Sequence, residues 1–97
     1  MDLYVILRRN GWADAAALDA AAERSAREGD KPGSGVRWIR SYVIREESGE
    51  LGTVCLYEAD SPEALRAHAV ASEMGADEVI PVADTVVVRP DPVSVAS

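Results

Sequence analysis

The sequence contains no phenylalanine, a single cysteine and a single histidine. One cysteine excludes an internal disulfide and a zinc site built from several thiolates. The longest apolar runs fall far short of the roughly 20 residues that a membrane-spanning helix needs. The first residues show neither the basic segment nor the apolar core of a signal peptide. We therefore expect a cytoplasmic protein that does not insert into a membrane.

Positive charge is also scarce, because 10 Lys and Arg residues stand against 17 Asp and Glu residues and give a formal net charge of −7. A surface of this sign repels phosphate groups. We therefore expect neither nucleic acid nor an anionic membrane surface as a partner. The 97 residues suffice for one domain with one hydrophobic core.

The clearest strand and helix signals lie in the middle of the chain. Residues 53–57 (TVCLY) are apolar, β-branched or aromatic without interruption, which is typical of a strand covered on both faces. Ser61, Pro62 and Glu63 then indicate a helix start, because the serine hydroxyl can accept a free amide and proline lacks one. Gly75 is expected to end this helix, since glycine takes a left-handed conformation without penalty.

The other elements follow from the apolar pattern and the turn residues. In chain order they are a central strand at 3–7 that ends at 8–11, a helix at 13–28 capped by Asp14, a loop at 29–35, a strand at 36–47, an edge strand at 78–82 and a strand or strand extension at 84–89. This order predicts an α+β fold of the ferredoxin-like βαββαβ kind, with two helices on one face of an antiparallel sheet. We assign residues 1–89 to one domain and 90–97 to a flexible tail.

The pairing of the two middle strands depends on the turn between them. Ser48 and Gly49 are typical of a hairpin turn, and we interpret the glutamates beside them as solvated. With this turn, the expected pairs on one face are Tyr42 with Cys55, Arg40 with Tyr57 and Trp38 with Ala59. A bulge at Gly52 would shift this register.

One face of this hairpin is the candidate ligand cleft. We call it the aromatic face and define it by five residues: Trp38, Arg40, Tyr42, Cys55 and Tyr57. We expect it to lie on the side of the sheet without helices. Such a face is too apolar to remain in water, so it is predicted to form a dimer interface or to line a cleft.

His68 is the only histidine and a candidate for chemistry. Helical spacing points it at the sheet, near Leu56, with Ser41 beside it in the expected register. One interpretation is a buried histidine that is hydrogen-bonded to Ser41. The other is a metal ligand or proton-transfer group, with Glu58 as the nearby carboxylate. Cys55 is interpreted as a packing residue, since no basic neighbour is visible in the sequence.

Four segments together carry a family resemblance. They are VRWIRSYV (Val36 to Val43), CLYEA (Cys55 to Ala59), SPEALRAHA (Ser61 to Ala69) and ADEVIPV (Ala76 to Val82). The chain resembles a family of small bacterial domains of otherwise unknown function, named after a nickel-responsive, nickel-binding member. The resemblance implies a ferredoxin-like fold, a homodimer and nickel ions at the dimer surface without catalysis. Family members often have a histidine in an H-S-Y motif where this chain has Arg40, Ser41 and Tyr42.

Three functions stay open at this point. The first is a non-catalytic, homodimeric metal-binding protein of the nickel-responsive type, with His68 and Glu58 as ligands, because nickel favours imidazole nitrogen with oxygen ligands. The second is a cofactor-free enzyme or ligand binder of the dimeric α+β-barrel kind, similar to a monooxygenase or cyclase, with its cleft on the aromatic face. The third is an accessory partner of another protein. None of them calls for an organic cofactor.

Overall fold

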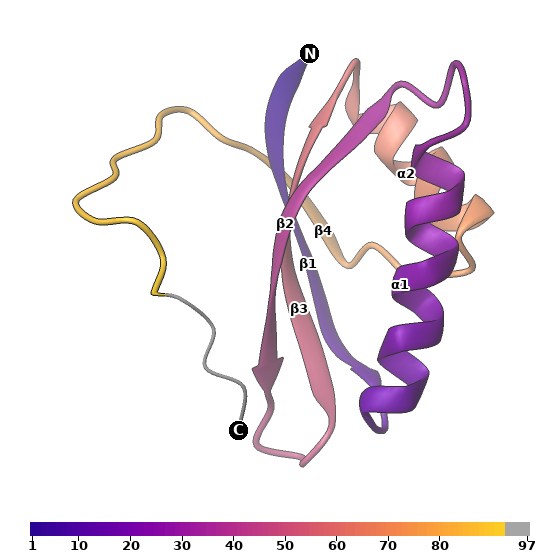
Figure 1. Ribbon diagram of the computed structural model, residues 1–97, viewed down its shortest axis with the longest axis vertical. Coiled ribbons are helices and arrows are strands. Elements are labelled where there is room, and N and C mark those ends of the chain that lie inside the picture. Colours follow the sequence, from indigo (N-terminus) through magenta and orange to yellow (C-terminus); the bar gives the residue numbers. More distant parts are fainter. Residues whose placement is uncertain (93–97) are drawn as a thin grey trace.

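A computed structural model describes residues 1–92 of the chain. Its elements are β1 (Asp2–Trp12), α1 (Ala15–Gly29), β2 (Val36–Arg45), β3 (Leu51–Ala59), α2 (Pro62–Ala71) and β4 (Glu78–Pro81). The strands form one antiparallel sheet in the order β2-β3-β1-β4, and both helices lie on one side of it (Figure 1). This arrangement confirms the predicted ferredoxin-like α+β fold, with the two apolar strands in the centre.

Both helices begin where the sequence predicts. The Asp14 carboxylate accepts a hydrogen bond from the Ala17 amide at 2.9 Å. The Ser61 hydroxyl accepts one from Ala64 at 3.1 Å, directly before Pro62. These contacts satisfy amide groups that the first helical turn leaves free.

The predicted end of the second helix is wrong. Helix α2 stops at Ala71, and Glu73, rather than Gly75, takes the left-handed conformation with φ of 58°. The Glu73 amide donates to the Val70 carbonyl and the Met74 amide to the Ala69 carbonyl. This is the hydrogen-bond pattern of a Schellman cap. The helix ends two residues early because these contacts satisfy its last carbonyl groups without a glycine.

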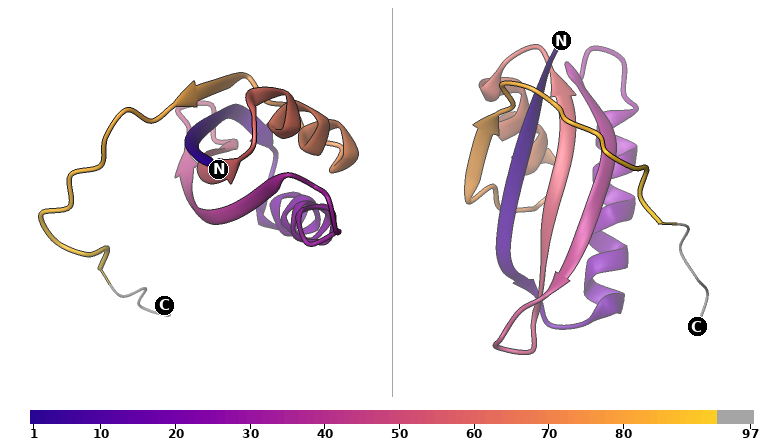
Figure 2. Two further views of the ribbon diagram at one scale, coloured as in Figure 1. Left: turned by 90° about the horizontal axis from the view of Figure 1, so that it is seen from above. Right: turned by 90° about the vertical axis from the view of Figure 1, so that its left-hand side faces the viewer.

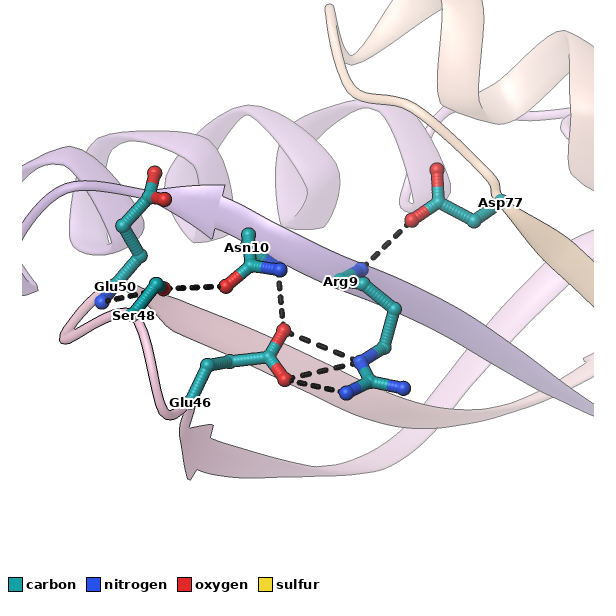
Figure 3. Close-up of polar contacts among 6 residues, drawn as sticks. All are labelled: Arg9, Asn10, Glu46, Ser48, Glu50 and Asp77. Atoms are coloured by element: carbon teal, nitrogen blue, oxygen red, sulfur yellow. Dashed lines mark hydrogen bonds and ion pairs between the residues drawn. The ribbon is translucent and has the colours of Figure 1, made fainter.

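Strand β1 continues past residues 8–11, where the sequence predicts its end. A bulge between Arg8 and Trp12 carries the strand on, with Asn10 at φ of 50°. The Glu46 carboxylate stabilises the bulge by accepting hydrogen bonds from the Asn10 amide and the Arg9 guanidinium (Figure 3). Its side chain is 5% exposed. The hydrogen bonds from Arg9 and Asn10 lower the pKa of Glu46 below its ordinary value, so this residue is not part of a solvated turn.

The expected register of the β2–β3 hairpin is also wrong. The Glu46 amide donates to the Glu50 carbonyl and the Gly49 amide to the Glu46 carbonyl, which leaves three residues in the turn instead of two. A second irregularity lies between Trp38 and Arg40. The observed pairs are Trp38 with Tyr57, Arg40 with Leu56, Ser41 with Cys55 and Tyr42 with Val54.

The core lies between the sheet and the helices and includes two residues of the aromatic face. Cys55 is 4% exposed and Tyr57 is 1% exposed, and both belong to a buried cluster with Tyr4, Ile6 and Leu65. The expectation that Cys55 and Tyr57 lie on the side without helices is therefore wrong. The sequence of an uninterrupted apolar strand does not indicate which of its two faces the helices cover, because both faces are apolar.

The opposite side of the sheet, which we call the helix-free face, is apolar as well. Alternation along the strands and their register place the following residues on it: Leu3, Val5, Leu7, Tyr42, Ile44, Val54, Leu56 and Ile80. All of them are half-buried or exposed in a single chain.

The segment after β4 crosses in front of the helix-free face and stands away from it (Figures 1 and 2). Asp91 anchors its far end by contacts with Arg40 and Tyr42. The predicted strand at 84–89 does not form, and Val86, Val87 and Val88 are exposed. The end of the predicted tail, residues 93–97, lies outside the described part of the chain.

Within residues 1–92, no helix combines the length and the apolar character that crossing a membrane requires.

Candidate functional site

His68 is buried between α2, α1 and the sheet, as its helical position predicts. Its Nε2 atom lies 3.1 Å from the Ser25 hydroxyl, which in turn lies 2.7 Å from the Tyr57 hydroxyl. The His68 ring is tilted against the Tyr57 ring, with 5.5 Å between centroids. Three elements thus meet in one polar contact chain inside an otherwise apolar core.

The partner of His68 is not the one expected. Ser41 lies at β2, where its hydroxyl donates to the Cys55 sulfur at 3.0 Å and accepts from the Trp38 indole at 2.8 Å. Ser25 takes its place, because α1 packs over this part of the sheet and brings a small polar residue to the histidine. Helical spacing gave the direction of the His68 side chain but not the neighbouring helix.

Burial lowers the pKa of His68 below its ordinary value, and the Arg8 guanidinium lowers it further, while Glu28 acts weakly in the opposite direction. A neutral ring is therefore favoured inside the fold. Burial likewise raises the pKa of Tyr57, against a lowering effect of the Ser25 hydrogen bond. The contact chain consists of uncharged groups that satisfy one another.

The structure does not bring His68 and Glu58 together. Glu58 alternates with the buried residues Tyr57 and Ala59, so it lies on the opposite side of the sheet from His68. There it forms an ion pair with Arg37 at 3.3 Å. Within the described residues 1–92, no three His, Cys, Asp or Glu side chains gather closely enough to hold a metal ion.

A cavity of about 530 Å³ lies on the helix side of the sheet, beneath α1. Its lining combines β-strand residues with the inner face of α1: Arg8, Trp12, Leu18, Asp19, Ala21, Ala22, Ser25, Trp38, Ile39, Arg40, Ser41, Val43, Thr53, Cys55, Tyr57 and Met74. Ala21 and Ala22 of α1 contribute only methyl groups to this lining. The volume is in the range of small-molecule sites.

Four of the five residues of the aromatic face line this cavity, and Tyr42 does not. Trp38 stacks on Tyr57 with 6.0 Å between ring centroids, and Cys55 lies beside them. The guanidinium of Arg40 instead contacts the Tyr42 hydroxyl and Asp91. The bulge in β2 splits the predicted face in this way, since it changes the alternation after Trp38.

Arg8 is the principal residue that sequence reasoning missed. It is 3% exposed, its Nε donates to the Gly75 carbonyl at 2.6 Å, and its Nη1 contacts the Cys55 sulfur at 3.3 Å. Cys55 therefore has a basic neighbour after all. Alternation from Tyr4 and Ile6 along β1 was the signal that could have placed Arg8 on the covered face.

The buried histidine predicts a pH dependence of stability. The free energy of unfolding is expected to fall as pH drops below 6.5, the ordinary pKa of histidine. The unfolded chain takes up a proton there while the native ring stays neutral. Replacing His68 with Gln should weaken this dependence between about pH 7.5 and 5.5, as urea denaturation at the two values would show. An unchanged dependence in His68→Gln would contradict a neutral, desolvated ring.

No curated protein matches the chain. The crystal structure of SCO4226 from Streptomyces coelicolor A3(2) is similar, with a TM-score of 0.68 and 22% sequence identity over 87% of this chain and 99% of that chain. This likeness shows a shared fold.

The sequence profile of one family matches residues 4–82, which is most of the 97-residue chain. The match includes the segments on which the resemblance was based and confirms it. The chain belongs to the family described as nickel responsive protein SCO4226-like.

Proposed function

We propose that the protein acts in the cytoplasm as a non-catalytic homodimer of the nickel-responsive type. Its family membership supports the general type. The observation that carries the dimer is the helix-free face, to which all four strands contribute apolar side chains. A second copy of the same face would cover it, as in other symmetric dimers. The segment after β4 carries the exposed residues Val86, Val87 and Val88, which would add apolar surface for the second copy.

The dimer is tested by changing the centre of the helix-free face. Leu56→Lys is expected to give a monomer in light scattering at micromolar concentration, because two lysines would be buried without partners. The matched control is Val70→Lys on the outer surface of α2, where Val70 is 78% exposed. A monomeric wild-type protein, or a dimeric Leu56→Lys variant, would contradict the proposed interface.

The side chains of residues 1–92 in one chain do not fit a nickel ion. No group of three donors gathers within residues 1–92, and the Nε2 atom of His68 faces Ser25 inside the core. Nickel needs several nitrogen and oxygen ligands in one geometry. We therefore propose that nickel binds at the surface of the dimer, as the family resemblance implies, and that His68 has a structural role.

Calorimetric titration with nickel tests this assignment on protein without a histidine tag. Wild type and His68→Gln are expected to bind nickel weakly and with affinities within about twofold of each other. The reason is that the buried ring is not available to the ion. Tight binding in wild type that is lost in His68→Gln would overturn the structural role of His68.

A second candidate function is the binding of a small molecule, as in proteins of the dimeric α+β-barrel kind. The specific observation in its favour is the cavity beneath α1, which contains most of the aromatic face. The two functions are compatible in space, because the cavity and the helix-free face lie on opposite sides of the sheet.

A further inference from the structure

We propose that the cavity beneath α1 binds an apolar ligand that bears one carboxylate, with Arg8 as the counter-ion. This inference rests on the second candidate function, small-molecule binding, and specifies the chemical class of the ligand.

The first argument is the unusual position of Arg8. Its guanidinium is buried, yet none of the ion pairs among residues 1–92 includes it. A buried charge without a counter-ion is costly, and a carboxylate in direct contact would offset this cost. Its guanidinium contacts the Gly75 carbonyl, which is uncharged, and the Cys55 sulfur, which is a weak acceptor.

The second argument is the location of the unpartnered atoms. Within residues 1–92, the buried side-chain nitrogen and oxygen atoms without a hydrogen-bond partner are Nη2 of Arg8 and Oγ1 of Thr53. Arg8 and Thr53 are directly opposite each other in the β1–β3 register, and both line the cavity. Native proteins rarely leave such groups unsatisfied, and an anionic group in the cavity would supply a partner to both.

The donors match a carboxylate. A guanidinium nitrogen and a neighbouring hydroxyl can each donate to one oxygen of the same anion. Directly opposite residues in a sheet have Cβ atoms about 5 Å apart, a separation that two such donors span across one small anion. Arg40, the other arginine of the lining, is paired with Asp91. The remaining guanidinium suits a single negative charge better than a polyanion, which the net charge of −7 would repel.

The other residues of the cavity lining indicate that the rest of the ligand is apolar. Apolar side chains dominate the lining, with Trp12, Leu18, Ala22, Trp38 and Met74 around the space. The lining extends from buried Arg8 to Ile39 and Val43, which are 38% and 53% exposed. The ligand would thus enter past these residues with its carboxylate leading toward Arg8 and its apolar body filling the cavity.

The test compares octanoate with octanamide, which has the same shape and no charge. Both tryptophans of the chain line the cavity, so tryptophan fluorescence reports on binding without a label. Wild type is expected to bind octanoate about tenfold more tightly than octanamide, as charge-assisted hydrogen bonds require. Calorimetry on the same pair gives an independent affinity.

Two variants locate the carboxylate. Arg8→Met should weaken octanoate binding by about tenfold and remove the preference over octanamide. Thr53→Val should fold as well as wild type, because the hydroxyl it removes has no partner within residues 1–92. It should weaken octanoate by about threefold and leave octanamide unchanged. Arg66→Met, on the exposed surface of α2, is the matched control and should bind octanoate like wild type.

The possible outcomes distinguish the carboxylate assignment from the second candidate function, small-molecule binding, on which it rests. Equal binding of octanoate and octanamide would preserve small-molecule binding and overturn the carboxylate assignment. Binding of octanoate that is unaffected by both Arg8→Met and Thr53→Val would also overturn it. Binding of neither compound would overturn the inference and the second candidate function together. If Arg8→Met fails to fold, Thr53→Val still decides the position of the carboxylate.

Discussion

Replacing Tyr57 with Ala is expected to lower the free energy of unfolding by about 3–5 kcal/mol, as for other large aromatic side chains that are removed from a core. Tyr57 is 1% exposed and lies in the central strand β3. Its ring stacks on Trp38 and contacts His68, and its hydroxyl bonds Ser25. The variant would therefore lose packing on both sides of the ring and leave a cavity next to the existing one.

Tyr57→Phe separates the ring from the hydroxyl. It should cost about 1–2 kcal/mol, because the Ser25 hydroxyl loses one partner but keeps His68. Urea denaturation of the three proteins measures both differences. A Tyr57→Ala variant within about 1 kcal/mol of wild type would contradict the central position of Tyr57 in the core.

Replacing Gly52 with Ala is expected to destabilise the fold by about 3 kcal/mol, at the upper end of the usual cost of overpacking. A Cβ atom at this position would lie 2.7 Å from the Arg8 carbonyl oxygen and 2.8 Å from a Glu46 carboxylate oxygen. The first of these atoms is backbone and cannot turn away. The second belongs to the carboxylate that stabilises the β1 bulge, so the substitution would disturb both strands.

Gly11→Ala is the matched control, because Gly11 lies in the same bulge and a Cβ atom there would meet nothing within 4 Å. This change should be neutral or stabilise the protein by less than about 1 kcal/mol. Thermal and urea unfolding of both variants measure the contrast. Similar stabilities of Gly52→Ala and Gly11→Ala would show that the close contact at Gly52 relaxes without cost.

Local signals in the sequence were sufficient for the order of the six elements and for the helix starts, but the strand predicted at 84–89 does not form. The caps at Asp14 and Ser61 act within a few residues, so their side chains and the amide groups they accept are fixed by chain proximity. Helical periodicity likewise determined that His68 points inward, since the face of an amphipathic helix depends only on its own residues.

The candidate site depended on contacts between elements that are distant in the chain. His68 meets Ser25 instead of Ser41 because α1 packs against α2, a relation that no local pattern contains. The bulge between Trp38 and Arg40 separates Tyr42 from Trp38, Cys55 and Tyr57. A shift of one residue moves side chains to the other face of a sheet. Tyr42 therefore lies outside the cavity that the other four residues of the predicted cleft line.

By itself, the sequence determined the α+β class, the element order, the helix starts and the burial of His68, because all of these follow from periodicity and short-range hydrogen bonds. Only the tertiary structure decided which face of the sheet the helices cover. It also decided that Arg8 and Thr53 lie opposite each other beside a cavity. The physical reason is that β1 and β3 are apolar on both faces, so their composition does not determine which face is covered. The packing of the helices and the two bulges determine it.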